Sequence, residues 1–164
     1  MHIYTLTFLL VFLPVTALIF YAVPAHYRVF VLFLASLYFY ASLSTLGLAI
    51  MLASVGLDLL MAKPLFLWGK GDRRAQLLLL LAAAKNILLF VSLSSLSQLR
   101  DTEMPLGVAV YAFTSLGYLV DLYNGEADLV VSPYEYGLFC CFFGKIYVGP
   151  ILSYNDFSRQ LRDF

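Results

Sequence analysis

The sequence predicts an all-α protein, a polytopic transmembrane helical bundle of about five spanning helices plus a re-entrant or half-span segment. Hydrophobic residues make up 62% of the 164 positions and charged residues only 12%, and the mean hydropathy is +0.88. A soluble domain carries about 25% charged residues. The apolar residues also form long uncharged runs between short polar breaks, which is the pattern of successive membrane spans. The whole chain, 1–164, is predicted to be one transmembrane domain.

The first predicted span covers residues 3–23. Residues 1–23 contain no Lys, Arg, Asp or Glu, and about 20 helical residues cross the hydrocarbon core. The alternative is a cleaved signal peptide, because residues 22–25 loosely resemble a processing site. The lack of a basic start and the length of the apolar run favour a retained helix, which Pro14 is expected to kink.

The next uncharged run, residues 29–57, is about 29 positions long, which is too long for one untilted helix. The stretch 42–47, with its Ser, Thr and Gly residues, is the predicted interruption and gives spans near 29–41 and 46–61. Asp58 falls near the end of the second of these spans. Because Lys63 and a helix end are close by, an interfacial ion pair is expected for Asp58, with a functional intramembrane acid as the alternative.

The polar loop at 63–74 is predicted to orient the chain in the membrane. Under the positive-inside rule a basic loop faces the cytoplasm. Counting back over the predicted spans places the N-terminus outside and the short basic break at 24–28 on the cytoplasmic side. The loop carries four basic residues against one acid, namely Lys63, Lys70, Arg73 and Arg74 against Asp72.

Residues 75–91, rich in Leu and Ala, form the fourth predicted span. Lys85 and Asn86 lie inside it, where a charged or amide side chain needs a polar partner, a cavity or access to the interface. They are candidates for an intramembrane polar network, and a structural ion pair or snorkelling of the lysine is the alternative. A polar loop is expected at 92–103.

The fifth predicted span covers residues 105–122. Pro105 starts it, because a proline in the first helical turn loses no hydrogen bond, and Asp121 marks its end. The apolar segment at 136–152 is different, because Gly149-Pro150 breaks any helix that passes through it. Broken backbone at membrane depth is tolerated only inside protein or along a polar cavity. This segment is therefore predicted to be re-entrant or a half-span.

Few residues suit catalysis or metal binding. The two histidines, His2 and His26, lie at the terminus and in the first loop, which is typical of ordinary interfacial histidines. Cys140 and Cys141 are neighbours, so we expect buried packing residues rather than a disulfide, with lipidation as the alternative. Ten basic and ten acidic residues give no net charge, so no nucleic-acid partner is predicted. The sequence contains no Gly-x-Ser-x-Gly elbow, no phosphate-binding Gly-rich loop and no metal-spaced cluster.

Two motifs occur in order, PLGVAVYAFTSLGYLVDLYNGE at 105–126 and FFGKIYVGPILSYNDFSRQL at 142–161. They resemble the signatures of the membrane-bound O-acyltransferase family, above all its bacterial alginate O-acetyltransferases and teichoic acid D-alanyl transfer proteins. The first motif departs from the family pattern at Ala109-Val110, Ala112 and Asn124, and the second has Gly144 where the family usually has proline. The matching positions of the first motif are Pro105, Leu106, Gly107, Tyr111, Phe113, Leu116, Tyr118, Asp121, Tyr123 and Gly125.

The resemblance implies a multi-pass protein of the inner membrane that transfers an acyl group, expected to be acetyl, to a hydroxyl of an extracytoplasmic glycan or envelope polymer. The implied donor is a thioester on coenzyme A or a carrier protein that arrives from the cytoplasm, with no bound cofactor. The implied partners are the lipid bilayer, the donor carrier and further envelope O-acetylation proteins. Tyr111, Tyr118, Asp121, Gly149 and Pro150 match positions that line the family's central funnel, and helix packing or capping is the alternative role for them.

The family's catalytic histidine lies in a helix well after the Gly-Pro-Ile element, in a much longer chain. No catalytic residue can therefore be carried over to this sequence, and we expect a fragment, a split gene or a degenerate copy. Whether the chain is itself an enzyme stays open at this point. The alternatives are a non-catalytic membrane scaffold or accessory subunit, and a piece of a small-molecule transporter.

Overall fold

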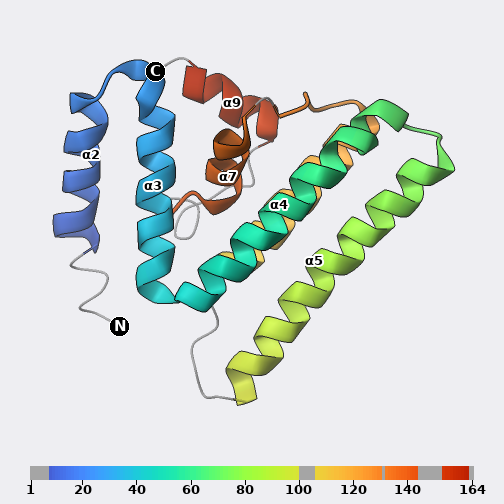
Figure 1. Cartoon of the computed structure of the whole chain (residues 1–164), viewed down its shortest axis with the longest axis horizontal. Helices are drawn as coiled ribbons and strands as arrows, with labels where there is room; N and C mark the ends of the chain where they lie inside the picture. Colours follow the sequence, from blue (N-terminus) through green and yellow to red (C-terminus); the bar gives the residue numbers. More distant parts are fainter. Residues whose placement is uncertain (1–7, 100–105, 131, 144–152, 163–164) are drawn as a thin grey trace.

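The structure is a computed structural model that describes residues 8–99, 106–130, 132–143 and 153–162. Within these ranges helix is the only regular secondary structure (Figure 1), which confirms the all-α prediction. In chain order the helices are η1 (Phe8–Phe12), α2 (Leu13–Ala22), α3 (Ala25–Leu43), α4 (Thr45–Trp68), α5 (Arg73–Leu99), α6 (Leu106–Asn124), α7 (Pro133–Cys141) and α9 (Tyr154–Arg162).

The helices form two groups joined by α7. The antiparallel helices α2 and α3 stand side by side, and α4, α5 and α6 pack together as an inclined group (Figure 1). Helix α7 packs against α3 on one side and against α6 and α4 on the other. The core therefore lies where α3, α4, α6 and α7 meet, while α2 and α5 flank it.

The effect of Pro14 appears as a π-helical turn, η1, directly before α2. Proline lacks the N–H of an intrahelical hydrogen bond, and its ring clashes with the carbonyl of the preceding turn. A wider turn at this point relieves the clash, and it leaves Pro14 in the first turn of α2, where a missing donor costs little.

The interruption expected at 42–47 is confirmed at Ser44. This residue has an extended backbone, with φ −162° and ψ 112°, and ends α3. Its hydroxyl oxygen accepts a hydrogen bond from the Gly47 backbone N–H at 3.1 Å, so the same side chain caps the start of α4. One serine thus ends one helix and begins the next, and the chain reverses direction there.

The loop predicted at 63–74 is shorter than expected. Helix α4 continues through Pro64 to Trp68, and the turn is confined to residues 69–72. Gly69 and Gly71 have φ values of 65° and 109°, a backbone region that favours glycine and permits so tight a reversal. The Asp72 carboxylate then accepts a hydrogen bond from the Arg74 N–H at 2.8 Å at the start of α5.

The polar loop predicted at 92–103 is wrong for its first part, because α5 continues to Leu99. The Ser94 hydroxyl donates to the Phe90 carbonyl at 2.7 Å, and the Ser95 hydroxyl donates to the Val91 carbonyl at 2.9 Å. A serine that bonds back to the preceding turn is compatible with a helix even in a serine-rich stretch. The composition of this stretch therefore suggested a loop where the backbone stays helical.

Two helices in the described part of the chain are long and apolar enough to cross a membrane, the stretches Thr45–Trp68 and Arg73–Ser95. Their outer sides carry many exposed leucines. Among the described side chains of α5, the large exposed apolar ones are Leu77, Leu80, Leu81, Ile87, Leu88 and Val91. The five spanning helices of the sequence analysis remain a prediction, and the boundary between lipid and water is part of that prediction.

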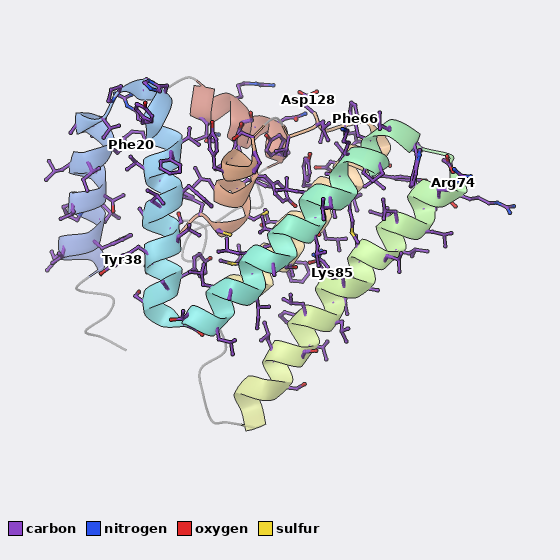
Figure 2. All side chains as sticks on the ribbon, in the orientation of Figure 1. Phe20, Tyr38, Phe66, Arg74, Lys85 and Asp128 are labelled. Carbon is purple, nitrogen blue, oxygen red and sulfur yellow. The ribbon has the colours of Figure 1, made fainter. Side chains whose placement is uncertain are left out.

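The polar connections gather at one end of the molecule. The α2–α3 junction, the turn at 69–72, the connection at 125–132 and α9 all lie at this end, whereas the Ser44 break and the last turns of α5 lie at the other (Figure 1). Figure 2 shows Arg74 and Asp128 at the first end and Lys85 midway along α5. Apart from Asp58 and Lys85, the charged side chains that the structure describes belong to these connections, to α9 or to the adjoining helix turns.

Candidate functional site: a buried charged network

The centre of the bundle holds an ion pair. The Lys85 ammonium on α5 lies 2.6 Å from the Asp58 carboxylate on α4, and the two side chains are 18% and 0% exposed. Figure 2 shows Lys85 on the side of α5 that faces α4. A buried carboxylate is tolerated only when a charge partner and hydrogen bonds replace the lost water. Lys85 supplies the charge partner.

Hydroxyl groups on α6 and α4 complete the shell around the pair. The Tyr111 and Ser115 hydroxyls both donate to the second Asp58 oxygen, each at 2.5 Å. Lys85 also donates to the Ser54 hydroxyl oxygen at 2.8 Å, and the Ser54 and Tyr111 oxygens lie 2.7 Å apart. Because the Tyr111 hydrogen points to Asp58, the Ser54 hydroxyl is the donor to Tyr111. We call Ser54, Asp58, Lys85, Tyr111 and Ser115 the central network.

Helix α7 joins the central network through Tyr136. Its phenol donates to the Ser115 oxygen at 3.3 Å, and its side chain is fully buried. The tyrosine ring packs against Tyr118 and Phe139, with centroid distances of 5.1 and 6.3 Å. Side chains from α4, α5, α6 and α7 therefore meet in one hydrogen-bonded unit.

The expected interfacial pair of Asp58 with Lys63 is wrong. Lys63 is exposed, while Asp58 lies on the buried face of α4. A residue five positions along a helix lies about 140° around its axis, so Lys63 points away from Asp58. Asp58 instead shares its face with the other buried residues of α4, namely Met51, Ser54, Val55, Ala62 and Leu65.

The two polar neighbours on α5, Lys85 and Asn86, have different surroundings. Lys85 is part of the central network. Asn86 is only 1% exposed, and neither its side-chain nitrogen nor its side-chain oxygen has a hydrogen-bond partner among the described residues. Consecutive helical residues point about 100° apart, which explains why a pair adjacent in sequence does not act as a unit.

Three of the predicted funnel residues lie on α6. Tyr111 belongs to the central network. The Tyr118 hydroxyl donates to the Asp128 carbonyl at 3.3 Å and accepts from the Val130 N–H at 3.1 Å, so it holds the connection at 125–132. Asp121 lies in the last turn of α6, where its backbone carbonyl accepts from the Glu126 N–H at 2.8 Å. Gly149 and Pro150 lie outside the described residues.

Residues of helix α9 also form hydrogen bonds to the connection at 125–132. The Asn155 amide donates to the Glu126 carbonyl at 2.8 Å, and its oxygen accepts from the Asp128 N–H at 3.1 Å. The Ser158 hydroxyl donates to the Glu135 carboxylate on α7 at 2.7 Å. Burial raises the pKa of the Tyr154 phenol above its usual range, and the Glu135 carboxylate adds to this shift, so Tyr154 stays neutral at physiological pH.

The contacts of Ser54, Lys85 and Tyr111 limit what they can do chemically. A serine beside a lysine is one known nucleophile–base arrangement. Here the Lys85 ammonium forms an ion pair with Asp58 and donates to the Ser54 oxygen, so it is not placed to accept the serine proton. Ser54 and Tyr111 are also buried, and their hydroxyls already form hydrogen bonds within the central network. The central network therefore suits positioning of helices rather than proton transfer to a substrate.

Other candidate groups lie apart from this network. His26 is exposed beside Tyr27, with ring centroids 3.7 Å apart. Cys140 and Cys141 on α7 are 1% and 0% exposed, which confirms the prediction of buried packing residues. Among the residues that the structure describes, no three His, Cys, Asp or Glu side chains gather as a metal site.

Hydropathy and motif matching had indicated only part of the central network. Lys85 and Tyr111 were candidates, whereas Ser54, Ser115 and Tyr136 were missed and Asp58 was misplaced. The one local signal was the spacing of Ser54 and Asp58, which are four residues apart and therefore on one helix face. The other partners lie 21 to 57 residues apart in sequence, so only the packing of helices brings them together.

Comparisons with known proteins give consistent relatives. The probable alginate O-acetylase AlgI of Pseudomonas fluorescens is 27% identical over 159 residues, which cover 95% of this chain and 32% of the relative. Proteins of the same name from Pseudomonas aeruginosa and Azotobacter vinelandii are each 25% identical, over 93% of this chain and 33% and 34% of theirs. No protein-family model matches the chain, and no solved structure matches it significantly.

The chain spans about a third of the length of the curated relatives that it matches. The match nevertheless extends over nearly all of this chain. The chain is thus related, over about a third of their length, to the alginate O-acetylases, the branch of the membrane-bound O-acyltransferase family that its motifs resemble.

Proposed function

We propose that this chain forms part of a membrane-bound O-acyltransferase that transfers an acyl group, in this case acetyl, to hydroxyls of an extracytoplasmic glycan or envelope polymer. The observation that carries the proposal is the relationship to alginate O-acetylases over 95% of the chain. The acyl donor is a thioester on coenzyme A or a carrier protein at the cytoplasmic face. The catalytic base is supplied from outside this chain.

The proposed setting is the inner membrane. Among the described residues, the charged side chains lie towards one end of the bundle, except for the Asp58–Lys85 pair at its centre. This arrangement supports a membrane setting, because charge in hydrocarbon must be paired. Under the positive-inside rule, the basic turn at 69–72 and its flanking residues support a cytoplasmic location for that end and an N-terminus outside. The two long apolar helices, α4 and α5, support the spanning arrangement.

Helix α7 is proposed to be the start of a re-entrant element. It begins after the connection at 125–132 and runs from the charged end towards the middle of the bundle, and α9 lies at the charged end again (Figure 1). Its 9 residues span only ~13.5 Å at 1.5 Å per residue, whereas the hydrocarbon core is about 30 Å thick. A short α7 that starts at the charged end, and an α9 at the same end (Figure 1), support a re-entrant element that lines a donor path.

The test of this proposal measures ester-linked acetate on exported polysaccharide. In the native host, deletion of the gene is expected to lower the acetate that mild alkali releases from the isolated polymer. The wild-type gene and Lys63→Met should restore it, because Lys63 is exposed and outside the central network. Lys85→Met should fail to restore it, because Asp58 loses its counter-charge. Unchanged acetate after deletion would refute the proposed activity.

A second candidate function is a non-catalytic scaffold or accessory subunit. The hydrogen bonding of the central network favours it, because Lys85, Asp58 and the surrounding hydroxyls are engaged with one another. The two functions differ in what membranes do with labelled acetyl-CoA. Acetyl transfer that requires both this chain and the protein that supplies the histidine would support the acyltransferase. Transfer by the histidine-bearing protein at the same rate without this chain would support the scaffold or accessory role.

A further inference from the structure

Helix α7 is tied to the ion pair through two hydroxyl groups in series. The Tyr136 phenol donates to the Ser115 oxygen at 3.3 Å, and the Ser115 hydroxyl donates to the Asp58 carboxylate at 2.5 Å. Asp58 in turn accepts from Lys85 at 2.6 Å. The series leads from α7 through α6 and α4 to α5, and it joins a short helix to the charged centre of the bundle.

Each hydroxyl in this series depends on the next one. Ser115 has a single hydrogen, so donating it to Asp58 leaves the oxygen lone pairs for Tyr136. Tyr136 is fully buried, and a buried phenol without a partner is costly. Hydrogen bonds in such a chain strengthen one another. A change at the ion pair therefore reaches the Tyr136 hydroxyl through Ser115.

The opposite side of α7 is fixed by shape. A Cβ on Gly137 would lie 2.6 Å from a ring carbon of Phe33 on α3, so the two helices approach closely there. Residues 136 and 137 point about 100° apart on the helix. One turn of α7 is thus held by steric fit to α3 on one side and by a directed hydrogen bond to α6 on another.

We infer that Tyr136 and Ser115 are positioning residues. They couple the depth and rotation of α7 to the presence of an intact Asp58–Lys85 pair. A slip of α7 by one residue, about 1.5 Å along its axis and 100° around it, would take the Tyr136 hydroxyl away from Ser115. Steric contact alone selects a distance between helices, whereas this bond selects a register. The consequence for acyl transfer is that the ion pair controls the position of the segment that follows α7, and this consequence rests on the proposed function.

The chain has two cysteines, and both lie on α7 as built-in reporters of its position. Cys140 and Cys141 are buried, so reaction with the membrane-permeant reagent N-ethylmaleimide requires α7 to move. The full chain is studied in membranes as two single-cysteine variants, Cys140→Ala and Cys141→Ala. In both backgrounds Tyr136→Phe should raise the alkylation rate about three- to tenfold, because one hydrogen bond is lost. Tyr134→Phe is the matched control, because Tyr134 is exposed on the same helix and should react at the wild-type rate.

Lys85→Met tests the coupling, because Lys85 lies on α5 at the far end of the series. It should also raise the alkylation rate, and combining it with Tyr136→Phe should add little to the larger single effect. Independent local roles predict instead that the two effects multiply. A wild-type rate in Tyr136→Phe, or multiplying effects in the double variant, would overturn the inference.

Ser115 provides a second test if Tyr136→Phe fails to accumulate in membranes. Ser115→Ala should raise the alkylation rate, and Ser115→Thr, which keeps the hydroxyl, should return it towards wild type. Equal rates in the two variants would refute the inference. Alkylation needs neither donor nor acceptor, so coupling without acetate transfer refutes the proposed function alone. Transfer without coupling refutes this inference alone.

Discussion

Single side chains decide how this bundle tolerates charge. Asp58 is fully buried, and its carboxylate has a counter-charge and two hydroxyl donors. Such a pair adds little net stability compared with apolar residues of similar volume, but loss of one partner leaves an uncompensated buried charge. The central network therefore acts mainly by specifying which faces of α4, α5 and α6 meet.

Replacement of Lys85 by methionine should destabilise the fold by about 3–5 kcal/mol, because a charged Asp58 stays behind without a partner. Adding Asp58→Asn to this variant should recover most of the loss, because the amide oxygen still accepts from Tyr111 and Ser115. The measurement is thermal unfolding of the purified chain in detergent. Lys63→Met, at an exposed position on α4, should change stability by less than about 0.5 kcal/mol. A double variant less stable than Lys85→Met would contradict this account.

Tyr118→Phe should loosen the connection at 125–132 and leave the helices intact. The phenylalanine keeps the ring packing but removes the oxygen that accepts from the Val130 N–H, at a cost of about 1–3 kcal/mol. Limited proteolysis should show faster cleavage within the connection. Tyr123→Phe on the same helix is the control. Equal cleavage of Tyr118→Phe and wild type would show that Asn155 alone holds this segment.

At the scale of elements, local side-chain chemistry explains the helix ends better than composition does. The serines at 94 and 95 belong to α5 because they bond back to its own carbonyls. Ser44, in contrast, breaks the chain because its hydroxyl caps the following helix. The same residue type thus continues one helix and ends another, and the difference lies in which backbone group its oxygen reaches.

The contact between α7 and α3 depends on Gly137. Gly137→Ala should destabilise the protein by about 1–3 kcal/mol, because the new methyl group would overlap the Phe33 ring. Combining Gly137→Ala with Phe33→Leu should restore part of the lost stability, because leucine is smaller than phenylalanine. Gly117→Ala is the control, because open space surrounds that position on α6, and it should be neutral or stabilising by up to about 1 kcal/mol. Thermal unfolding in detergent compares the three, and equal behaviour of both alanine variants would refute the close approach.

For the whole molecule, the arrangement of connections makes a prediction about sidedness. The turn at 69–72 and α9 lie at one end and the Ser44 break at the other (Figure 1). In a chain with Cys140→Ala and Cys141→Ala, cysteines placed at Lys70 and Gln160 should react with an impermeant maleimide from the cytoplasmic side. A cysteine at Ser42, which is also exposed, should react from the outside. If the cysteine at Gln160 reacts from the same side as the one at Ser42, the turn at 69–72 and α9 do not share one side of the membrane.

The sequence by itself determined the helical class, the division of the second uncharged run within residues 42–47, and the relationship carried by two motifs. These features depend on composition, spacing and local backbone chemistry, which a single stretch of chain contains. Only the tertiary structure decided that Asp58 pairs with Lys85 rather than Lys63, that Asn86 stays apart from Lys85, and that Tyr136 joins α7 to the pair. The partners lie on different helices, and no period within one helix encodes which face of another helix will meet it.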